Sequence, residues 1–69
     1  MIPIKDKTYQ IAYRGFFEYD GYIGRAICTN DTPDIDGWYE FTLIEPADVP
    51  NTKGILFDQK DIVALVENL

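Results

Sequence analysis

Apolar and polar residues alternate along residues 8–19, which is the pattern of a β-strand with one buried face. From position 9 onward every odd residue is apolar or glycine, and most even residues are polar. Asp20 and Gly21 follow this run, and Asp-Gly is favoured in two-residue type I′ turns because both central residues adopt positive φ. The pattern therefore predicts a long hairpin over residues 8–28 that reverses at this pair.

A two-residue turn at this pair also sets the register of the hairpin. The expected partners on the inward face are Tyr19 with Tyr22, Phe17 with Gly24, Gly15 with Ala26 and Tyr13 with Cys28. Large side chains then meet small ones across the strands, which suits close packing. On the outward face the same register places Phe16 opposite Arg25 and Arg14 opposite Ile27.

Residues 38–45 alternate again and predict a third strand. Tyr39, Phe41 and Leu43 share one side of that strand. We expect these three side chains to face the core. Trp38 is in the opposite phase, so it either projects outward near the acidic segment or packs under the long loop beside the core.

Turn-forming residues separate the remaining segments. Residues 29–37 are rich in Asn, Asp, Pro and Gly and predict a loop. A second connector over residues 45–54 contains two prolines and a glycine, and it leads to a short fourth strand at residues 55–57.

Two structures are open for residues 59–69. A helix of about ten residues is one, because four apolar residues follow the i, i+3, i+4, i+7 spacing, with Asp58 as N-cap and Asp61 in the first turn. Those apolar residues are Ile62, Leu65, Val66 and Leu69. The other is a 3₁₀ turn over residues 59–61 and a closing strand over residues 63–66 that returns to the first strand. The strand is favoured, because closure removes an exposed sheet edge.

This succession of strands and turns resembles the SH3-like small barrel. The likeness covers residues 8–67, with an aromatic hairpin, a turn-rich loop in mid-chain and a 3₁₀ turn in residues 55–62 before the last strand. Fold alone implies no ligand. The expected fold is all-β, a small SH3-like barrel of about five strands in a single domain over residues 1–69. The alternative is an α+β fold, a four-stranded antiparallel sheet with a C-terminal helix.

Charge changes the picture in the middle of the chain. The net charge is −6, and residues 26–52 contain no Lys or Arg. The acidic residues there are Asp31, Asp34, Asp36, Glu40, Glu45 and Asp48. A field of this sign repels nucleic acid and anionic lipid. We therefore expect a protein partner with a basic surface, and neither nucleic acid nor a membrane.

The composition also restricts the chemistry. The chain has no histidine and one cysteine, Cys28, so it forms no internal disulfide and no Cys/His metal cage. Cys28 is expected to be an apolar, semi-buried residue, in keeping with a reducing compartment. The N-terminal residues lack a signal-peptide apolar region, and no run approaches the ~20 apolar residues of a membrane span. The expected location is therefore the cytoplasm, as a soluble protein.

Residues 34–37, Asp-Ile-Asp-Gly, resemble the middle of an EF-hand calcium loop. That alignment places Thr32 at the first ligand position and Leu43 at the last, so both key carboxylates are missing. Asp34 and Asp36 are better interpreted as solvated loop acids than as an acid/base pair. We expect no catalytic residue, no metal and no cofactor, and hence no enzyme.

Binding is the expected role. An exposed tryptophan is a common interface anchor, and here it lies beside the acidic segment. The candidate binding residues are Trp38, Asp31, Asp34, Asp36 and Glu40. We interpret the chain as a non-enzymatic acidic protein-interaction module. Its sharper form is an inhibitor that mimics nucleic-acid charge, since the chain is similar in size and charge to small acidic phage-encoded antagonists.

Two alternatives stay open. One is a nucleic-acid-binding small barrel with Arg14, Phe16 and Arg25 as a stacking platform on the outward face of the hairpin. The other is an accessory subunit of a larger assembly.

Overall fold

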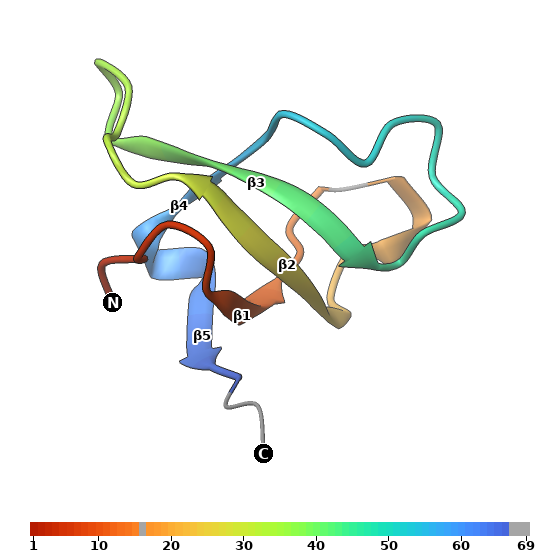
Figure 1. The fold of residues 1–69 in the computed structure, drawn as a ribbon. Coiled ribbons are helices and arrows are strands. Elements are labelled where there is room, and N and C mark those ends of the chain that lie inside the picture. The colour runs from red at the N-terminus through yellow and green to blue at the C-terminus, as the bar shows by residue number, and fades with distance from the viewer. Residues whose placement is uncertain (16, 67–69) are drawn as a thin grey trace.

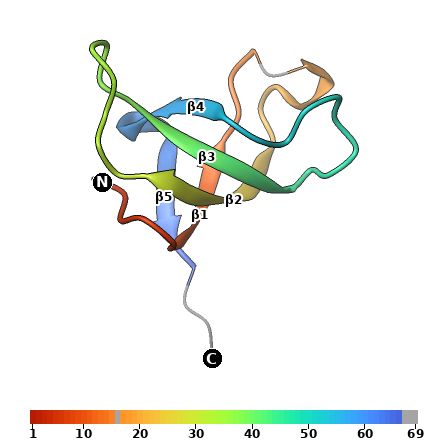
Figure 2. The ribbon, with the colours of Figure 1, turned by 45° about the horizontal axis from the view of Figure 1, so that its top comes forward.

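Five antiparallel strands make up the fold in the computed structural model, which describes residues 1–15 and 17–66 (Figure 1). They are β1 (Thr8–Ala12), β2 (Ile23–Asn30), β3 (Trp38–Glu45), β4 (Ile55–Asp58) and β5 (Ile62–Leu65), with 3₁₀ turns at Phe17–Tyr19 and Gln59–Asp61. Their order in the sheet is β4-β3-β2-β1-β5. The sheet curls into a half-barrel, and a second view shows β5 beside β1 (Figure 2). The all-β prediction is confirmed.

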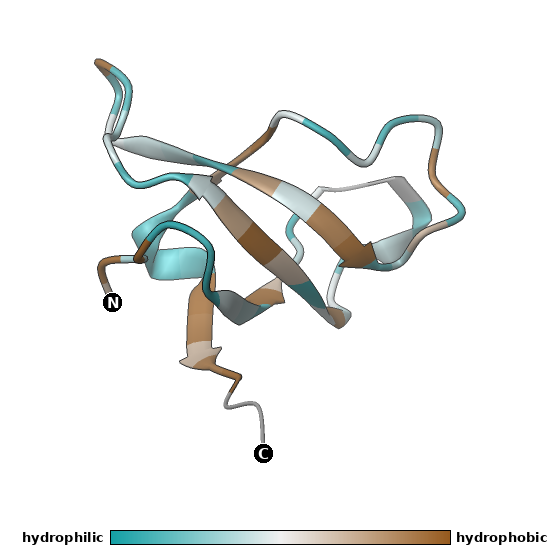
Figure 3. Cartoon of the chain, viewed as in Figure 1, coloured by the Kyte–Doolittle hydropathy of each residue, from teal (hydrophilic) through white to brown (hydrophobic). Residues whose placement is uncertain are grey.

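The concave face of this sheet holds the core. Its buried apolar residues are Tyr9, Ile11, Tyr13, Ala26, Cys28, Tyr39, Phe41, Leu43, Phe57 and Ile62. Every second residue of β2 and β3 is buried on this face, and the apolar segments of both strands appear brown in Figure 3. The Phe41 ring packs edge-on against Tyr9 and Phe57, with centroid distances of 6.3 and 5.7 Å. Aromatic rings thus supply much of the buried area that so short a chain needs.

The register predicted for the first hairpin is wrong. β1 ends at Ala12, and Ala26 lies opposite Tyr9 instead of Gly15, a shift of six residues. Because side chains alternate with a period of two, an even shift leaves the same residues of β1 and β2 facing inward. The inward positions of Tyr9 and Cys28 are therefore as expected although their partners are not.

Asp20 and Gly21 do form a turn, but it lies at the end of a longer connection between β1 and β2. The Tyr22 N–H donates to the Tyr19 carbonyl at 2.9 Å. Only Gly21 of the central pair has positive φ, at 88°, whereas a type I′ turn needs both. The Tyr13 N–H donates to the Tyr22 carbonyl at 2.9 Å and closes the base of the connection. Tyr22, expected in the core, is consequently exposed.

Part of the predicted hairpin falls outside the described structure. Phe16, expected on the outward face, is not among the described residues, and neither is the side chain of Phe17, which was expected inward. Gly15 has φ of 62°, so the chain leaves the extended conformation at this residue.

The third strand is confirmed at Trp38–Glu45. Tyr39, Phe41 and Leu43 are buried on its inward side, and Trp38 projects from the other. The predicted fourth strand is also present, one residue longer than expected.

The C-terminal segment forms the predicted 3₁₀ turn and closing strand, so the helix alternative is wrong. The Asp58 carboxylate accepts the Lys60 N–H at 3.1 Å, and the Asp61 carboxylate accepts the Asp58 N–H at 3.3 Å. The Asp58 carboxylate also accepts the Asp61 N–H, and the reciprocal bonds between Asp58 and Asp61 form a capping box around the turn Gln59–Asp61. Ile62 is extended, and β5 then pairs with β1. This pairing satisfies backbone N–H and C=O groups at the edge of β1 that a C-terminal helix would leave unpaired. Leu69 lies outside the described residues.

Tyr13 ties the end of β1 to the end of β3 across β2. Its hydroxyl donates to the main-chain carbonyl of Glu45 at 2.5 Å. The bond passes over Gly24, where an added Cβ would lie 2.1 Å from the Glu45 oxygen and 2.4 Å from the Tyr13 ring. Glycine at this position is therefore required for the close approach of the two strands.

Asp61 is a buried carboxylate, 6% exposed, and it is paired with Arg14. The Nε and Nη2 atoms of Arg14 lie 2.7 and 2.6 Å from Asp61 Oδ1. This pair joins the segment that follows β1 to the turn that precedes β5. A second ion pair, Arg25 with Glu45 at 3.2 Å, lies on the surface with both side chains about half exposed.

Gly24→Ala should lower the free energy of unfolding by about 3 kcal/mol or more, because the methyl group overlaps main-chain and ring atoms that have no room to move. Gly21→Ala is the matched control, since open space surrounds that position and only the backbone conformation, with φ of 88°, is disfavoured. Its cost should be about 1–2 kcal/mol. Urea denaturation measures both, and equal losses would contradict the role given to Gly24.

The ion pairs of Arg14 and Arg25 should contribute differently to the free energy of unfolding. Arg14→Met leaves the Asp61 carboxylate buried without its partner, and we expect a loss of about 1–2 kcal/mol. Arg25→Met breaks only an exposed pair and should cost less than about 1 kcal/mol. Thermal denaturation of the two variants checks this order, and a larger effect from Arg25 would reverse the assignment.

Candidate functional site

Trp38 starts β3 and projects from the outer face of the sheet, with 39% of its surface exposed. On β4, Asp58 lies opposite Trp38 and Leu56 lies opposite Glu40. Leu56 is exposed as well. Two apolar and two acidic side chains therefore share this part of the outer face.

Asp34 shapes the loop that leads into Trp38. One carboxylate oxygen, Oδ1, accepts the N–H groups of both Asp36 and Trp38, each at 2.9 Å. The Asp34 N–H in turn donates to the Trp38 carbonyl, and the Gly37 N–H donates to the Asp34 carbonyl, again at 2.9 Å. The loop is thus a hydrogen-bonded turn. The sequence indicated that Asp34 is a solvated loop acid, and the structure adds that it is also the acceptor that shapes the loop backbone. We refer to residues 31–37 as the acidic loop.

Of the other predicted carboxylates, Asp31 and Asp36 lie in the acidic loop and Glu40 lies on β3. Asp31 accepts the Lys5 N–H at 3.4 Å, and Glu40 accepts the Thr29 hydroxyl at 2.9 Å. Within residues 1–15 and 17–66, the Asp36 carboxylate makes no hydrogen bond or ion pair and is exposed. The structure brings these acids and Trp38 together at one end of the half-barrel, where β2 and β3 are joined (Figure 1).

Sequence reasoning missed Ile35 as a site residue. This side chain lies in the acidic loop and is fully exposed. Its signal in the sequence is an apolar residue between two acids, Asp34 and Asp36, in a segment otherwise made of turn-forming residues. Ile35 adds a second exposed apolar group to the surface around Trp38.

The alternative face built on Arg14, Phe16 and Arg25 depended on the predicted register, which is wrong. Arg25 lies opposite Gln10, and its guanidinium pairs with Glu45. Arg14 follows the end of β1 and pairs with a different carboxylate at the far turn. Phe16 is outside the described residues. The two guanidinium groups are therefore committed to separate ion pairs.

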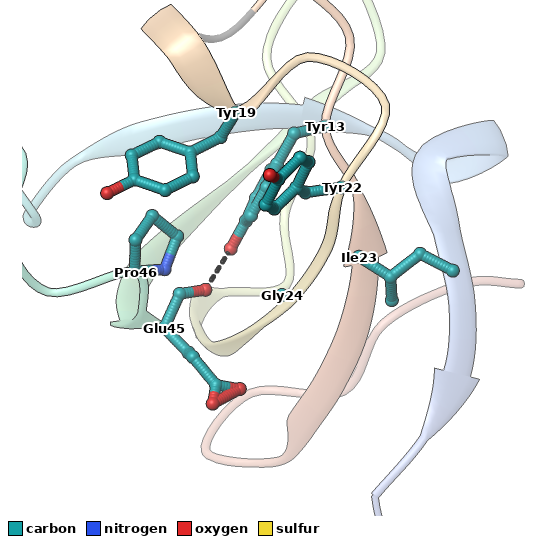
Figure 4. Close-up of a pocket in the computed structure, with 7 residues that line it drawn as sticks. All are labelled: Tyr13, Tyr19, Tyr22, Ile23, Gly24, Glu45 and Pro46. Atoms are coloured by element: carbon teal, nitrogen blue, oxygen red, sulfur yellow. Dashed lines mark hydrogen bonds between the residues drawn. The ribbon is translucent and has the colours of Figure 1, made fainter.

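A hollow of about 330 Å³ lies at the other end of β3 (Figure 4). Its lining residues are Tyr13, Tyr19, Tyr22, Ile23, Gly24, Glu45 and Pro46. The Tyr19 and Tyr22 rings meet edge to face, with centroids 5.9 Å apart and planes at 79°. The Tyr19 hydroxyl donates to Asp48 at 2.5 Å. We refer to this feature as the tyrosine hollow. The sequence did not predict this hollow, because the expected hairpin placed Tyr13, Tyr19 and Tyr22 on one packed face.

Two tyrosines of this hollow have raised pKa values. Burial raises the pKa of Tyr13 to about 12, and the nearby charge of Glu45 adds to the effect. The hydrogen bond to Asp48 raises the pKa of Tyr19 to about 12, with further contributions from burial and from the charges of Asp48 and Glu18. Both hydroxyls therefore stay protonated far above neutral pH.

Burial raises the pKa of the Cys28 thiol, which disfavours the nucleophilic thiolate. In residues 1–15 and 17–66, no group of three or more His, Cys, Asp or Glu side chains is placed to hold a metal ion. None of the helices in that part of the chain has the length and apolar character to cross a membrane.

The free energy of unfolding should fall as pH rises from about 10 to about 12. The folded state keeps the Tyr13 proton up to a pKa of about 12, while an unfolded tyrosine loses it near 10.0, so the stabilisation is complete below pH 10 and is lost through this interval. Over this range the Tyr13→Phe variant should lose less free energy of unfolding than the unmodified chain, by up to about 2–3 kcal/mol in total. Urea denaturation at a series of pH values measures it, and equal slopes in both proteins would contradict the shift.

Comparison of the chain with protein-family models, with curated proteins and with solved structures found no match.

Proposed function

We propose that this chain is a non-enzymatic, acidic protein-interaction module that binds a basic protein surface through Trp38 and the acidic loop. The observation that supports it most is the pair of hydrogen bonds that the Asp34 carboxylate accepts from the loop backbone, which hold Ile35 and Trp38 exposed together. A loop already held in one conformation loses less entropy when it binds. Exposed aromatic side chains of this kind frequently carry much of the binding energy of an interface.

The charge around this surface favours a basic partner. Asp31, Asp36 and Glu40 lie around Trp38, and no lysine or arginine occurs in residues 26–52. A field of one sign accelerates the encounter with an oppositely charged protein, while the apolar contacts slow dissociation. A partner with a basic rim and an apolar pocket for Trp38 matches both features.

In its sharper form the module is an inhibitor that occupies the nucleic-acid site of a basic protein. Carboxylates at Asp31, Asp36 and Glu40 would take the place of phosphates. Competition is the test, because an oligonucleotide that binds the partner should displace this chain. A ternary complex of this chain, the partner and the oligonucleotide would contradict the inhibitory role, although the chain would still bind the partner.

Two narrower assignments belong to the same proposal. The half-barrel is proposed as SH3-like, supported by the strand order β4-β3-β2-β1-β5 and by the 3₁₀ turn between β4 and β5. A cytoplasmic location is proposed as well, supported by the free, buried thiol of Cys28.

The nucleic-acid alternative on Arg14, Phe16 and Arg25 is not favoured by any contact in the described residues, since both arginines are already paired with carboxylates. Membership of a larger assembly remains compatible with the proposed surface, because a subunit contact would use the same exposed side chains.

Trp38→Ala should weaken binding to the partner at least about 30-fold, the effect of removing one interface hot spot. The partner is first captured from a lysate of the source organism with the unmodified chain, then purified. Isothermal titration calorimetry at several salt concentrations measures the Kd of each variant.

A charge-matched pair of variants separates the effect of charge in the acidic loop from the effect of the net charge of the chain. Asp36→Asn should slow association and reduce its salt dependence, whereas Glu18→Gln removes the same charge at the other end of the molecule and should have a smaller effect. Unchanged affinity of Trp38→Ala, or equal effects of the two charge variants, would contradict the proposed surface.

A further inference from the structure

The tyrosine hollow presents aromatic rings from two directions. Tyr13 is buried and forms its floor, while Tyr22 is 64% exposed and Tyr19 is half-buried at the mouth. The Tyr19 and Tyr22 rings stand nearly perpendicular, at 79°. In Figure 4 these rings and Pro46 surround the same space, and the Ile23 side chain points away from it. Aromatic faces carry negative potential, so such a space attracts a cation that tolerates apolar surroundings.

The charges around the hollow have the same sign. Asp48 accepts the Tyr19 hydroxyl, which also makes that ring more electron-rich. Glu18 and Glu45 lie close enough to raise the pKa values of Tyr19 and Tyr13 through their charge. Arg25 offsets Glu45, since the two form an ion pair. The remaining charge next to the tyrosines is negative.

We propose that the tyrosine hollow binds a methylated ammonium group. Such a group has a diffuse positive charge and an apolar outer shell, which aromatic rings accommodate without hydrogen bonds. A metal ion is a poorer fit, because the Asp48 carboxylate is directed to the Tyr19 hydroxyl and the Glu45 carboxylate to Arg25. A primary ammonium is also a poorer fit, because the Glu45 carbonyl at the floor already accepts the Tyr13 hydroxyl.

The dimensions suit one head group and are separate from the Trp38 surface. A volume of about 330 Å³ is at the lower end of small-molecule sites, ~300–1,000 Å³. Trp38 and Glu45 occupy the two ends of β3, roughly 23 Å apart at ~3.3 Å per residue. The hollow is therefore a second site, and its test is independent of the proposed protein partner.

Choline is the first probe, with 3,3-dimethylbutan-1-ol as its uncharged isostere of nearly the same shape. Titration followed by ¹H–¹⁵N NMR should show saturable shifts with choline in the amides of residues 13, 19, 22–24 and 45. Affinity for the isostere should be about 3- to 30-fold lower, because it lacks the charge. Added salt should weaken choline binding and leave the isostere unaffected.

Variants locate the binding. Tyr22→Leu keeps an apolar wall but removes an aromatic face at an exposed position, so the protein should stay folded while choline binding falls about 3- to 30-fold. Trp38→Leu is the control, because it removes the exposed aromatic ring at the far end of β3. Equal losses in the two variants would overturn the proposal, since they would indicate nonspecific attraction of cations to exposed rings.

A short peptide carrying trimethyl-lysine, compared with its unmethylated form, identifies the source of the group. Tighter binding of the methylated peptide than of choline would assign the hollow to a modified protein side chain. Equal affinities would assign it to a free small cation. If neither probe produces saturable shifts, or the isostere binds as tightly as choline, the proposal is wrong.

Discussion

The hydrogen bond from the Tyr13 hydroxyl to the Glu45 carbonyl is the constraint on which the arrangement of this half-barrel depends. It joins the end of β1 to the end of β3, two strands that do not pair directly, and it requires Gly24 on the strand between them. The bond crosses β2 on the concave face of the sheet, so it favours the curled arrangement. The same bond makes Tyr13 the floor of the tyrosine hollow. Curvature and the hollow therefore have one physical origin.

Periodicity in the sequence predicted which faces of β1, β2 and β3 are buried, but not how the strands pair. Alternation placed Tyr9 and Cys28 inward correctly even though the register was six residues off, because any even shift preserves the faces. The register was wrong because Asp20 and Gly21 form a local turn without bringing β1 and β2 together there. Likewise, both a helix and a strand fitted the C-terminal spacing. Pairing with β1 decided for the strand, and that is a contact between distant parts of the chain.

The exposure of the apolar residues of the candidate site was predictable only where it follows from a strand. The outward position of Trp38 follows from alternation along β3, and the structure confirms it. Ile35 lies in a loop, where no period indicates whether an apolar residue is covered or exposed. Tyr19 and Tyr22 were assigned to a continuous strand, so their arrangement around a hollow could not be predicted once the chain left the extended conformation after β1. Sequence reasoning thus located the acidic surface and missed the aromatic one.

Several carboxylates of this chain act both as hydrogen-bond acceptors and as charges. Asp34 accepts two backbone N–H groups in the acidic loop, and Asp48 accepts the Tyr19 hydroxyl beside the tyrosine hollow. Accepting a hydrogen bond from a neutral donor leaves the negative charge in place, so each group shapes its loop and contributes to the field around it. An alanine substitution at either position would remove both effects together. An asparagine retains an acceptor oxygen without the charge, so comparison of the two substitutions separates the shape of each surface from its electrostatic attraction.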